Sequence, residues 1–282
     1  MTRPLTLIGF GEAGACFARA GGWRGDARVY DKLTDAPATR DATLRHYDEA
    51  EVAGTDSLAE ALTDADLIIS LVTADAALAV ADASASLIAS GALFCDMNSV
   101  SPATKRQAAA AIDAAGGHYV DVAVMAPVYP AGLAVPLLLS GRHGEEAAAR
   151  LAALGFADSR PVGAEIGRAS AIKMIRSVMV KGLEALTTEC ATAADAAGVR
   201  AEVFASLDAG WRAGQSWEER AAYNLERMLR HGGRRAAEME EVVKTLDALS
   251  VASGMSRATR ESQRDAGRLG AAASNRKQDR AA

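Results

Sequence analysis

The chain has 282 residues, a formal net charge of −5 and 50% hydrophobic positions, a length that allows one large domain or two of ordinary size. Alanine accounts for 65 residues, and aromatic residues make up only 5%, which favours closely packed helices. The acidic balance and the lack of a basic run before the C-terminal end argue against a nucleic-acid-binding protein, which needs a positively charged surface.

The first half of the chain alternates short apolar runs with longer alanine-rich stretches, as β-α-β units do. We expect strands at Leu5–Gly9, Ala27–Asp31, Leu67–Val72, Leu93–Asp96, Tyr119–Val124 and Val135–Leu139. We expect helices between them at Glu12–Ala20, Ser57–Leu62, Ala76–Ala89 and Pro102–Ala115. This order predicts an α/β fold with a Rossmann-type, doubly wound parallel sheet over residues 1–162.

After about Pro161 the strand pattern ends. Helices are expected within Ile166–Ala197, at Glu202–Ala209, after the capping box Ser216–Glu219, and around Ala236–Leu249. These helices predict an all-α domain over residues 163–270. Its aromatic residues Trp211, Trp217 and Tyr223 are expected in the core or at a subunit interface, with substrate contact as the alternative. Residues 271–282 are polar, and we expect a flexible tail there.

Val122–Ser140 has no charged residue over 19 positions, which is close to a membrane-spanning length. Three prolines and Gly132 would break a helix there, so two buried strands joined by a turn explain this stretch better. The N-terminus shows no secretory leader pattern, and Cys16, Cys95 and Cys190 are too far apart in sequence to suggest a metal or redox motif. We therefore expect a cytoplasmic protein with no membrane segment.

A glycine-rich sequence follows the first expected strand and opens a helix. It consists of Gly9, Phe10, Gly11, Glu12, Ala13 and Gly14. The second strand ends in Asp31, 22 residues after the first glycine, which completes a dinucleotide-binding fingerprint in its required context. The diphosphate would lie at the helix N-terminus, where unpaired N–H groups and the helix dipole favour negative charge.

Asp31 also indicates which dinucleotide is bound. Its carboxylate would accept hydrogen bonds from the adenosine ribose hydroxyls and would repel a 2′-phosphate, which favours NAD over NADP. Lys32 and Arg40 lie close enough in sequence to weaken this preference, so NADP stays an open alternative.

The stretch Ala169–Lys181 is mostly apolar but carries Lys173, Ser177 and Lys181 at a spacing that places them on one helix face. A half-buried lysine needs a partner or a task. Desolvation lowers the pKa of a lysine towards the range that suits a general acid/base, and Ser177 could bind the same substrate atom. The alternative is that these lysines extend into solvent at a domain or subunit boundary.

Several segments, taken together and in chain order, resemble the β-hydroxyacid dehydrogenases, the family of 3-hydroxyisobutyrate and 6-phosphogluconate dehydrogenases. They are the turn at 9–14, Asp96–Pro102, Tyr119–Asp121 with its following loop, and the Lys173 helix. Within the family the chain resembles a poorly characterised branch with a divergent helical C-terminal domain. The resemblance implies an NAD(P)-dependent oxidoreductase that acts on the CH–OH group of a small molecule and forms a homodimer through its C-terminal helices.

The resemblance also implies roles for individual residues. Lys173 is then the catalytic general acid/base, and Ser177 stands where the family has an asparagine. The nicotinamide side of the cofactor falls on four residues: Val72, Thr73, Asn98 and Ser99. No metal is implied, and the four histidines of the chain lack metal-ligand spacing.

The substrate loop departs from the family pattern Asp-x-Pro-Val-Ser-Gly-Gly. Here Asp121 is followed by Val122, Ala123, Val124, Met125, Ala126 and Pro127. Met125 removes the serine hydroxyl, and Pro127 removes a backbone N–H donor. We therefore expect Val124, Met125 and Ala126 to line a more apolar pocket for a bulkier or less acidic substrate. Alternatively, Arg168 or Arg176 holds an anionic group.

Two other functions stay open. An imine reductase on the same fold would reduce C=N bonds; the apolar loop favours it, whereas Lys173 argues against it because related imine reductases usually replace that lysine. A non-catalytic NAD(P)-binding regulatory protein would bind the cofactor without turnover.

Overall fold

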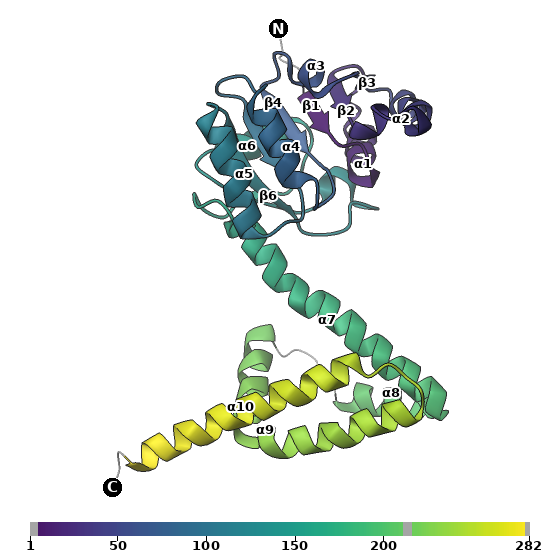
Figure 1. The fold of residues 1–282 in the computed structure, drawn as a ribbon, viewed down its shortest axis with the longest axis vertical. Helices are drawn as coiled ribbons and strands as arrows, with labels where there is room; N and C mark the ends of the chain where they lie inside the picture. The colour runs from purple at the N-terminus through teal and green to yellow at the C-terminus, as the bar shows by residue number, and fades with distance from the viewer. Residues whose placement is uncertain (1–4, 211–215, 280–282) are drawn as a thin grey trace. The chain divides into compact units, whose positions relative to one another are not determined.

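The computed structural model describes residues 5–210 and 216–279. The chain divides into two units, Met1–Arg176 and Ser177–Ala282, and each is described by itself (Figure 1). The division falls later than the boundary at 162 that the sequence predicted. The reason is helix α7 (Arg168–Ala197), whose first turn is buried in the first unit at Ala169 and Ser170.

The described part of the first unit is built on one eight-stranded sheet in the order β3-β2-β1-β4-β5-β6-β7-β8. Its strands are β1 (Leu5–Ile8), β2 (Ala27–Tyr30), β3 (Ala53–Gly54), β4 (Leu67–Ser70), β5 (Leu93–Asp96), β6 (His118–Val124), β7 (Leu137–Ser140) and β8 (Ser159–Pro161). Neighbouring strands run parallel except for β6 and β7. Most of this antiparallel pairing lies in the uncharged stretch at 122–140, where the sequence predicted two buried strands.

Helices cover both faces of the sheet. The sheet face that contains Leu7 packs against α1 (Glu12–Gly21), α2 (Pro37–Glu49) and α6 (Gly144–Ala153). The opposite face, which contains Ile8, packs against α3 (Leu58–Leu62), α4 (Ala77–Ala85) and α5 (Pro102–Ala114). Successive strand residues point to opposite faces, so both faces of β1 are buried. The fold is the doubly wound α/β arrangement that the sequence predicted; short 3-10 turns at Lys32–Thr34 and Gly132–Ala134 complete the unit.

The described part of the second unit is helical. It contains the remainder of α7 and the helices α8 (Arg200–Gly210), α9 (Trp217–Ala248) and α10 (Gly254–Asp279). The capping box forms as predicted: the Ser216 N–H donates to Glu219 Oε2 at 2.9 Å, and the Glu219 N–H donates to Ser216 Oγ at 3.2 Å.

Two features of the second unit differ from the sequence prediction. Helix α9 is continuous from Trp217 to Ala248, whereas the sequence predicted one helix after the capping box and a second around Ala236–Leu249. Helix α10 continues to Asp279, whereas a flexible tail was expected from residue 271.

Helices α9 and α10 lie side by side (Figure 1). Side chains at Gly232 and Gly267 would collide with the facing backbone, so glycine permits this close packing.

Some sequence predictions are not covered by the structure. Trp211 lies outside the described residues, as do the side chains of Trp217 and Lys181. Tyr223 is 44% exposed. None of the described helices combines the length and hydrophobicity that crossing a bilayer requires.

Candidate functional site

The glycine-rich turn follows β1, and its close packing explains why two of its positions are glycine. Gly9 has a φ of +89°, and a Cβ there would lie 2.5 Å from the Leu71 carbonyl oxygen. A Cβ on Gly14 would lie 2.8 Å from the Gly9 carbonyl oxygen. A side chain at either position would therefore force the turn away from β4 or α1 away from the turn.

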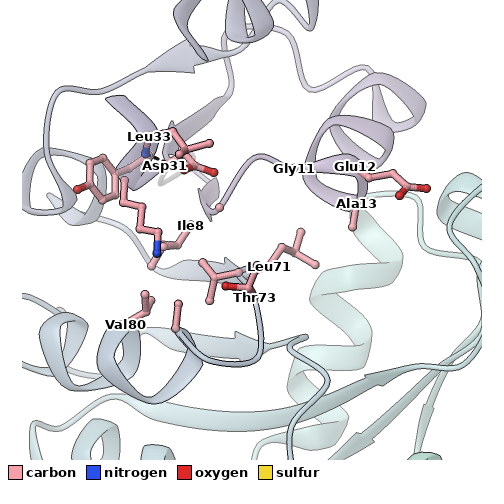
Figure 2. Close-up of a pocket in the computed structure, with 14 residues that line it drawn as sticks. Ile8, Gly11, Glu12, Ala13, Asp31, Leu33, Leu71, Thr73 and Val80 are labelled. Atoms are coloured by element: carbon pink, nitrogen blue, oxygen red, sulfur yellow. Dashed lines mark hydrogen bonds between the residues drawn. The ribbon is translucent and has the colours of Figure 1, made fainter. Parts of the chain in front are cut away.

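Gly11 has a different environment, since a Cβ there would meet no described atom within 4 Å. It is the N-cap of α1, and among the described residues no side chain caps this helix end. In Figure 2 the Glu12 carboxylate points away from the other labelled side chains. The backbone N–H groups at the start of α1 are thus available to an anion that approaches over Gly11.

A cavity of about 430 Å³ lies beside this turn. It lies beyond the carboxyl ends of β1 and β4, where the strand order of the sheet reverses, which is the usual ligand site of doubly wound folds. Figure 2 shows its walls, which come from the turn, the end of β2, the loop after β4 and helix α4. The lining residues include Gly9, Gly11, Glu12, Ala13, Asp31, Lys32, Leu71, Val72, Thr73 and Val80. The cavity and the open helix end fit a dinucleotide.

Asp31 lies at the edge of this cavity with a fixed orientation. Its Oδ2 accepts from the Phe10 N–H at 2.8 Å, and its Oδ1 accepts from the Leu33 N–H at 2.9 Å. Each carboxylate oxygen keeps a further lone pair for a ribose hydroxyl. Lys32 also lines the cavity, whereas Arg40 donates to Asp56 Oδ1 at 2.6 Å and to the Thr34 carbonyl at 3.0 Å.

The loops after β4 and β5 are joined by Asn98. Its Oδ1 accepts from the Val72 N–H at 2.7 Å, and its Nδ2 donates to Ser70 Oγ at 3.0 Å. The structure therefore brings together the two segments predicted to face the nicotinamide, Val72–Thr73 and Asn98–Ser99.

Lys173 reaches the second of these segments. The half-buried side chain donates from Nζ to Ser99 Oγ at 2.6 Å. Three residues further along α7, Arg176 donates from its guanidinium to the Met125 carbonyl at 3.2 Å. In the first unit, the catalytic candidate and its helix thus contact the two loops that the sequence analysis assigned to cofactor and substrate. Ser177 is the first residue of the second unit.

The comparisons with known proteins agree with this geometry. Residues 5–150, more than half of the chain, match the family model described as the NAD binding domain of 6-phosphogluconate dehydrogenase. The chain belongs to this family. It therefore has an NAD(P)-binding domain of the dehydrogenase type. The glycine-rich turn predicted the dinucleotide, and the family resemblance predicted the dehydrogenase type. Residues 194–266 of this family member match a domain of unknown function, DUF1932.

Solved structures place this family member among dehydrogenase-like folds. A conserved hypothetical protein from Sinorhizobium meliloti 1021 is 40% identical, with 93% of this chain and 88% of that chain covered and a TM-score of 0.63. A conserved protein of unknown function, described as structurally similar to 3-hydroxyacid dehydrogenases, is 31% identical, with 95% and 98% covered and a TM-score of 0.60.

An imine reductase from Streptomyces aurantiacus shares the fold at 18% identity, with 95% of each chain covered and a TM-score of 0.72. A search of curated proteins found no match.

Near the candidate site, sequence reasoning missed the role of a buried lysine, Lys105. This side chain is 0% exposed and lies 2.9 Å from Asp96 Oδ1 and 3.4 Å from Asp121 Oδ1. In the sequence Lys105 looks like a surface charge on an alanine-rich helix. The available signal was the pair of acidic residues in adjacent predicted strands, which need a counter-charge if they are buried.

The fold also brings together two histidines that are distant in sequence. The rings of His118 and His143 stack with centroids 3.6 Å apart, and Glu146 lies beside them. The stacked rings are nearly parallel, so their nitrogens do not converge on one point as metal ligands would.

Burial raises the pKa of the Cys95 thiol to about 12, which keeps this thiol protonated and unreactive at neutral pH.

Proposed function

We propose that this protein transfers a hydride between a nicotinamide cofactor and the alcohol or carbonyl carbon of a small-molecule substrate, with Lys173 as general acid/base. The observation that supports this most is the 2.6 Å hydrogen bond from Lys173 Nζ to Ser99 Oγ. This hydrogen bond connects α7 to the loop after β5, at the carboxyl ends of the strands, where doubly wound folds bind their ligands.

Each of these residues has a proposed role in cofactor binding or proton transfer. The turn at 9–14 would hold the pyrophosphate, Asp31 the adenosine ribose, and the loops that Asn98 joins the nicotinamide; the cofactor supplies the hydride chemistry when bound. Lys173 Nζ takes the proton of the substrate hydroxyl during oxidation and returns it during reduction. Ser99 Oγ accepts a hydrogen bond from Nζ and so orients the lysine. Ser177 is proposed to bind the same substrate oxygen.

The substrate side is proposed to be more apolar than in well-known members of the family. Val124, Met125 and Ala126 would line it, and Met125 packs against a small apolar cluster that includes Ala123 and Leu138. The guanidinium of Arg176, held at the Met125 carbonyl, is the group we assign to an anionic part of the substrate. A bulky hydroxy or keto acid with a weak or distant negative charge fits this combination.

The experiment is a substrate panel measured with both NAD and NADP. Purified protein is mixed with alcohols, hydroxy acids, ketones and cyclic imines, and the absorbance of the reduced nicotinamide is followed. We expect turnover of a hydroxy or keto compound, with a preference for NAD.

Two results of the panel favour the alternatives. Turnover restricted to imines would indicate an imine reductase, which the apolar loop and the shared fold favour. Cofactor binding with no turnover of any compound would indicate a regulatory protein.

We also propose a cytoplasmic homodimer that forms through α7. This helix carries large apolar side chains three or four residues apart that are 36–72% exposed in the single chain: Ile172, Ile175, Met179, Leu183 and Leu186. Such a stripe matches the pattern by which two helices pack together. Light scattering of the wild type should give twice the chain mass, and Met179→Lys should shift it to the monomer. The three cysteines are free, which suits a reducing compartment.

A further inference from the structure

A buried charge cluster lies beneath the candidate site, where β5 and β6 run next to each other. Asp96 and Asp121 are paired across these strands, and Lys105 extends from α5 between them. All three side chains are at most 1% exposed. Lys105 Nζ donates to the Asp96 carbonyl at 2.6 Å and lies 2.9 Å from Asp96 Oδ1. Burying three charged groups is unfavourable unless they are paired and hydrogen-bonded, so the remaining partners of the two carboxylates matter.

The Asp96 carboxylate holds the loop that carries Ser99. Its Oδ1 accepts from the Asn98 N–H at 2.9 Å, and its Oδ2 accepts from the Tyr119 hydroxyl at 2.6 Å. Burial and the neighbouring Asp96 raise the pKa of the Tyr119 hydroxyl, so this group remains a donor at all working pH values. The backbone that leads into Ser99 is thereby fixed to a rigid, buried anchor.

The Asp121 carboxylate holds the start of α7. Its Oδ2 accepts from the Ser170 N–H at 3.0 Å, from Ser170 Oγ at 2.9 Å and from Ser140 Oγ at 3.0 Å. Ser140 Oγ in turn accepts from the Ala169 N–H at 3.0 Å. A carboxylate at a helix N-terminus is favourable for the helix dipole. Ser170 lies one turn before Lys173, so the anchor fixes the turn from which the catalytic lysine extends.

We propose that Asp96, Lys105 and Asp121 are positioning residues that set Lys173 against Ser99. Lys105 is fully buried and so touches neither substrate nor cofactor. It acts by holding two carboxylates that would otherwise repel each other, one tied to the Ser99 loop and the other to the Lys173 helix. The proposal rests on the proposed function of Lys173.

The first test removes one anchor bond while keeping the charges. Ser170→Ala should lower kcat on the best substrate of the panel by roughly 10- to 100-fold, the scale expected for a small misplacement of a catalytic group. The KM for NAD should stay unchanged, and Ser170→Thr, which keeps the hydroxyl, should restore kcat. The matched control is Ser84→Ala, which removes a buried hydroxyl on α4 outside this cluster and should leave kcat unchanged. An unaffected kcat in Ser170→Ala would overturn the proposal.

The second test needs no substrate, so it separates this proposal from the proposed function. Amide hydrogen exchange is measured on the full chain with Lys105→Met, and with Ser170→Ala where the first variant does not fold. In Lys105→Met, exchange should accelerate by roughly 10-fold or more in both 97–100 and 169–172, while residues 9–21 keep their protection. In Ser170→Ala the same acceleration should appear in 169–172. Faster exchange in neither segment, or equally faster exchange everywhere, would contradict a local positioning role.

Discussion

The two edges of the candidate site follow the family to different degrees. The cofactor edge, the part proposed to bind the nicotinamide dinucleotide, keeps the glycine-rich turn, Asp31 and the Asn98 link between two loops. Close packing requires glycine in the turn, and backbone N–H groups hold the side chains of Asp31 and Asn98. The substrate edge keeps Lys173 but replaces the loop that would grip a carboxylate with Met125, Ala126 and Pro127. This difference supports the proposed function, in which the hydride chemistry of the family is combined with a different substrate.

The largest effect is expected at the residue that the two edges share. Lys173→Met removes the group that gives and takes the proton, so kcat should fall by roughly 10²- to 10⁴-fold. The affinity for NAD, measured by fluorescence titration, should change little because the proposed pyrophosphate and ribose contacts, at the turn and at Asp31, do not involve Lys173. Lys173→Arg keeps the charge but cannot release the proton, so it should be nearly as inactive. A wild-type rate in either variant would remove Lys173 from the mechanism.

The glycine-rich turn offers a matched pair of variants. Gly9→Ala places a Cβ against the Leu71 carbonyl at a positive φ, so it should lower the free energy of unfolding by about 1–3 kcal/mol and also weaken NAD binding. In Gly11→Ala the new Cβ meets no described atom, so thermal unfolding should stay unchanged. The Cβ would occupy the space over the start of α1 that the diphosphate is proposed to fill, so NAD binding should weaken. If Gly11→Ala bound NAD normally, the assignment of the diphosphate to this turn would be wrong.

Asp31 tests the choice of cofactor. Asp31→Asn removes the negative charge next to the ribose, so NAD affinity should fall by about 10-fold, or about 1.4 kcal/mol, while the NADP to NAD preference rises. The control is Asp35→Asn, since Asp35 accepts from the Tyr30 hydroxyl and is exposed; its preference should match the wild type. Calorimetric titration with both cofactors measures this. A wild type that already prefers NADP would show that the role of Asp31 has been misread.

Arg176 tests the substrate edge, where we expect the smallest effect. Arg176→Ala should raise the KM of an anionic substrate about 5-fold, which corresponds to about 1 kcal/mol for an exposed hydrogen-bonded group. The KM of an uncharged analogue should not move, and Arg168→Ala should resemble the wild type. Steady-state kinetics with the two substrates gives the comparison, and equal changes for both would argue against a role in binding the anion.

The sequence predicted the parts of the site that depend on local spacing. The turn at 9–14, the following strand and Asp31 lie within 23 residues, and their meaning depends on strand and helix periods that are visible in the chain. Helix α7 was also predictable, because a long stretch without proline ends at Gly198.

The missed features depend on tertiary contacts. Helix α2 is polar with one buried residue, Tyr47, and so lacks the apolar stripe by which helices are recognised. Lys105 appears as one charge on an amphipathic helix, and only the pairing of β5 with β6 places two carboxylates around it. The attachment of the start of α7 to the first unit was not visible in the sequence for a similar reason, since the bonds from Ser170 to Asp121 join residues far apart in sequence.

The central claim is that a hydride moves between the nicotinamide and a carbon atom of the substrate. Reduced cofactor that carries deuterium at the transferred position of its nicotinamide ring is incubated with the best keto substrate of the panel, and the product is analysed by mass spectrometry. We predict one deuterium on the carbon that bears the new hydroxyl and a rate that collapses in Lys173→Met. Product without deuterium, or tight cofactor binding with no product from any substrate, would contradict the claim.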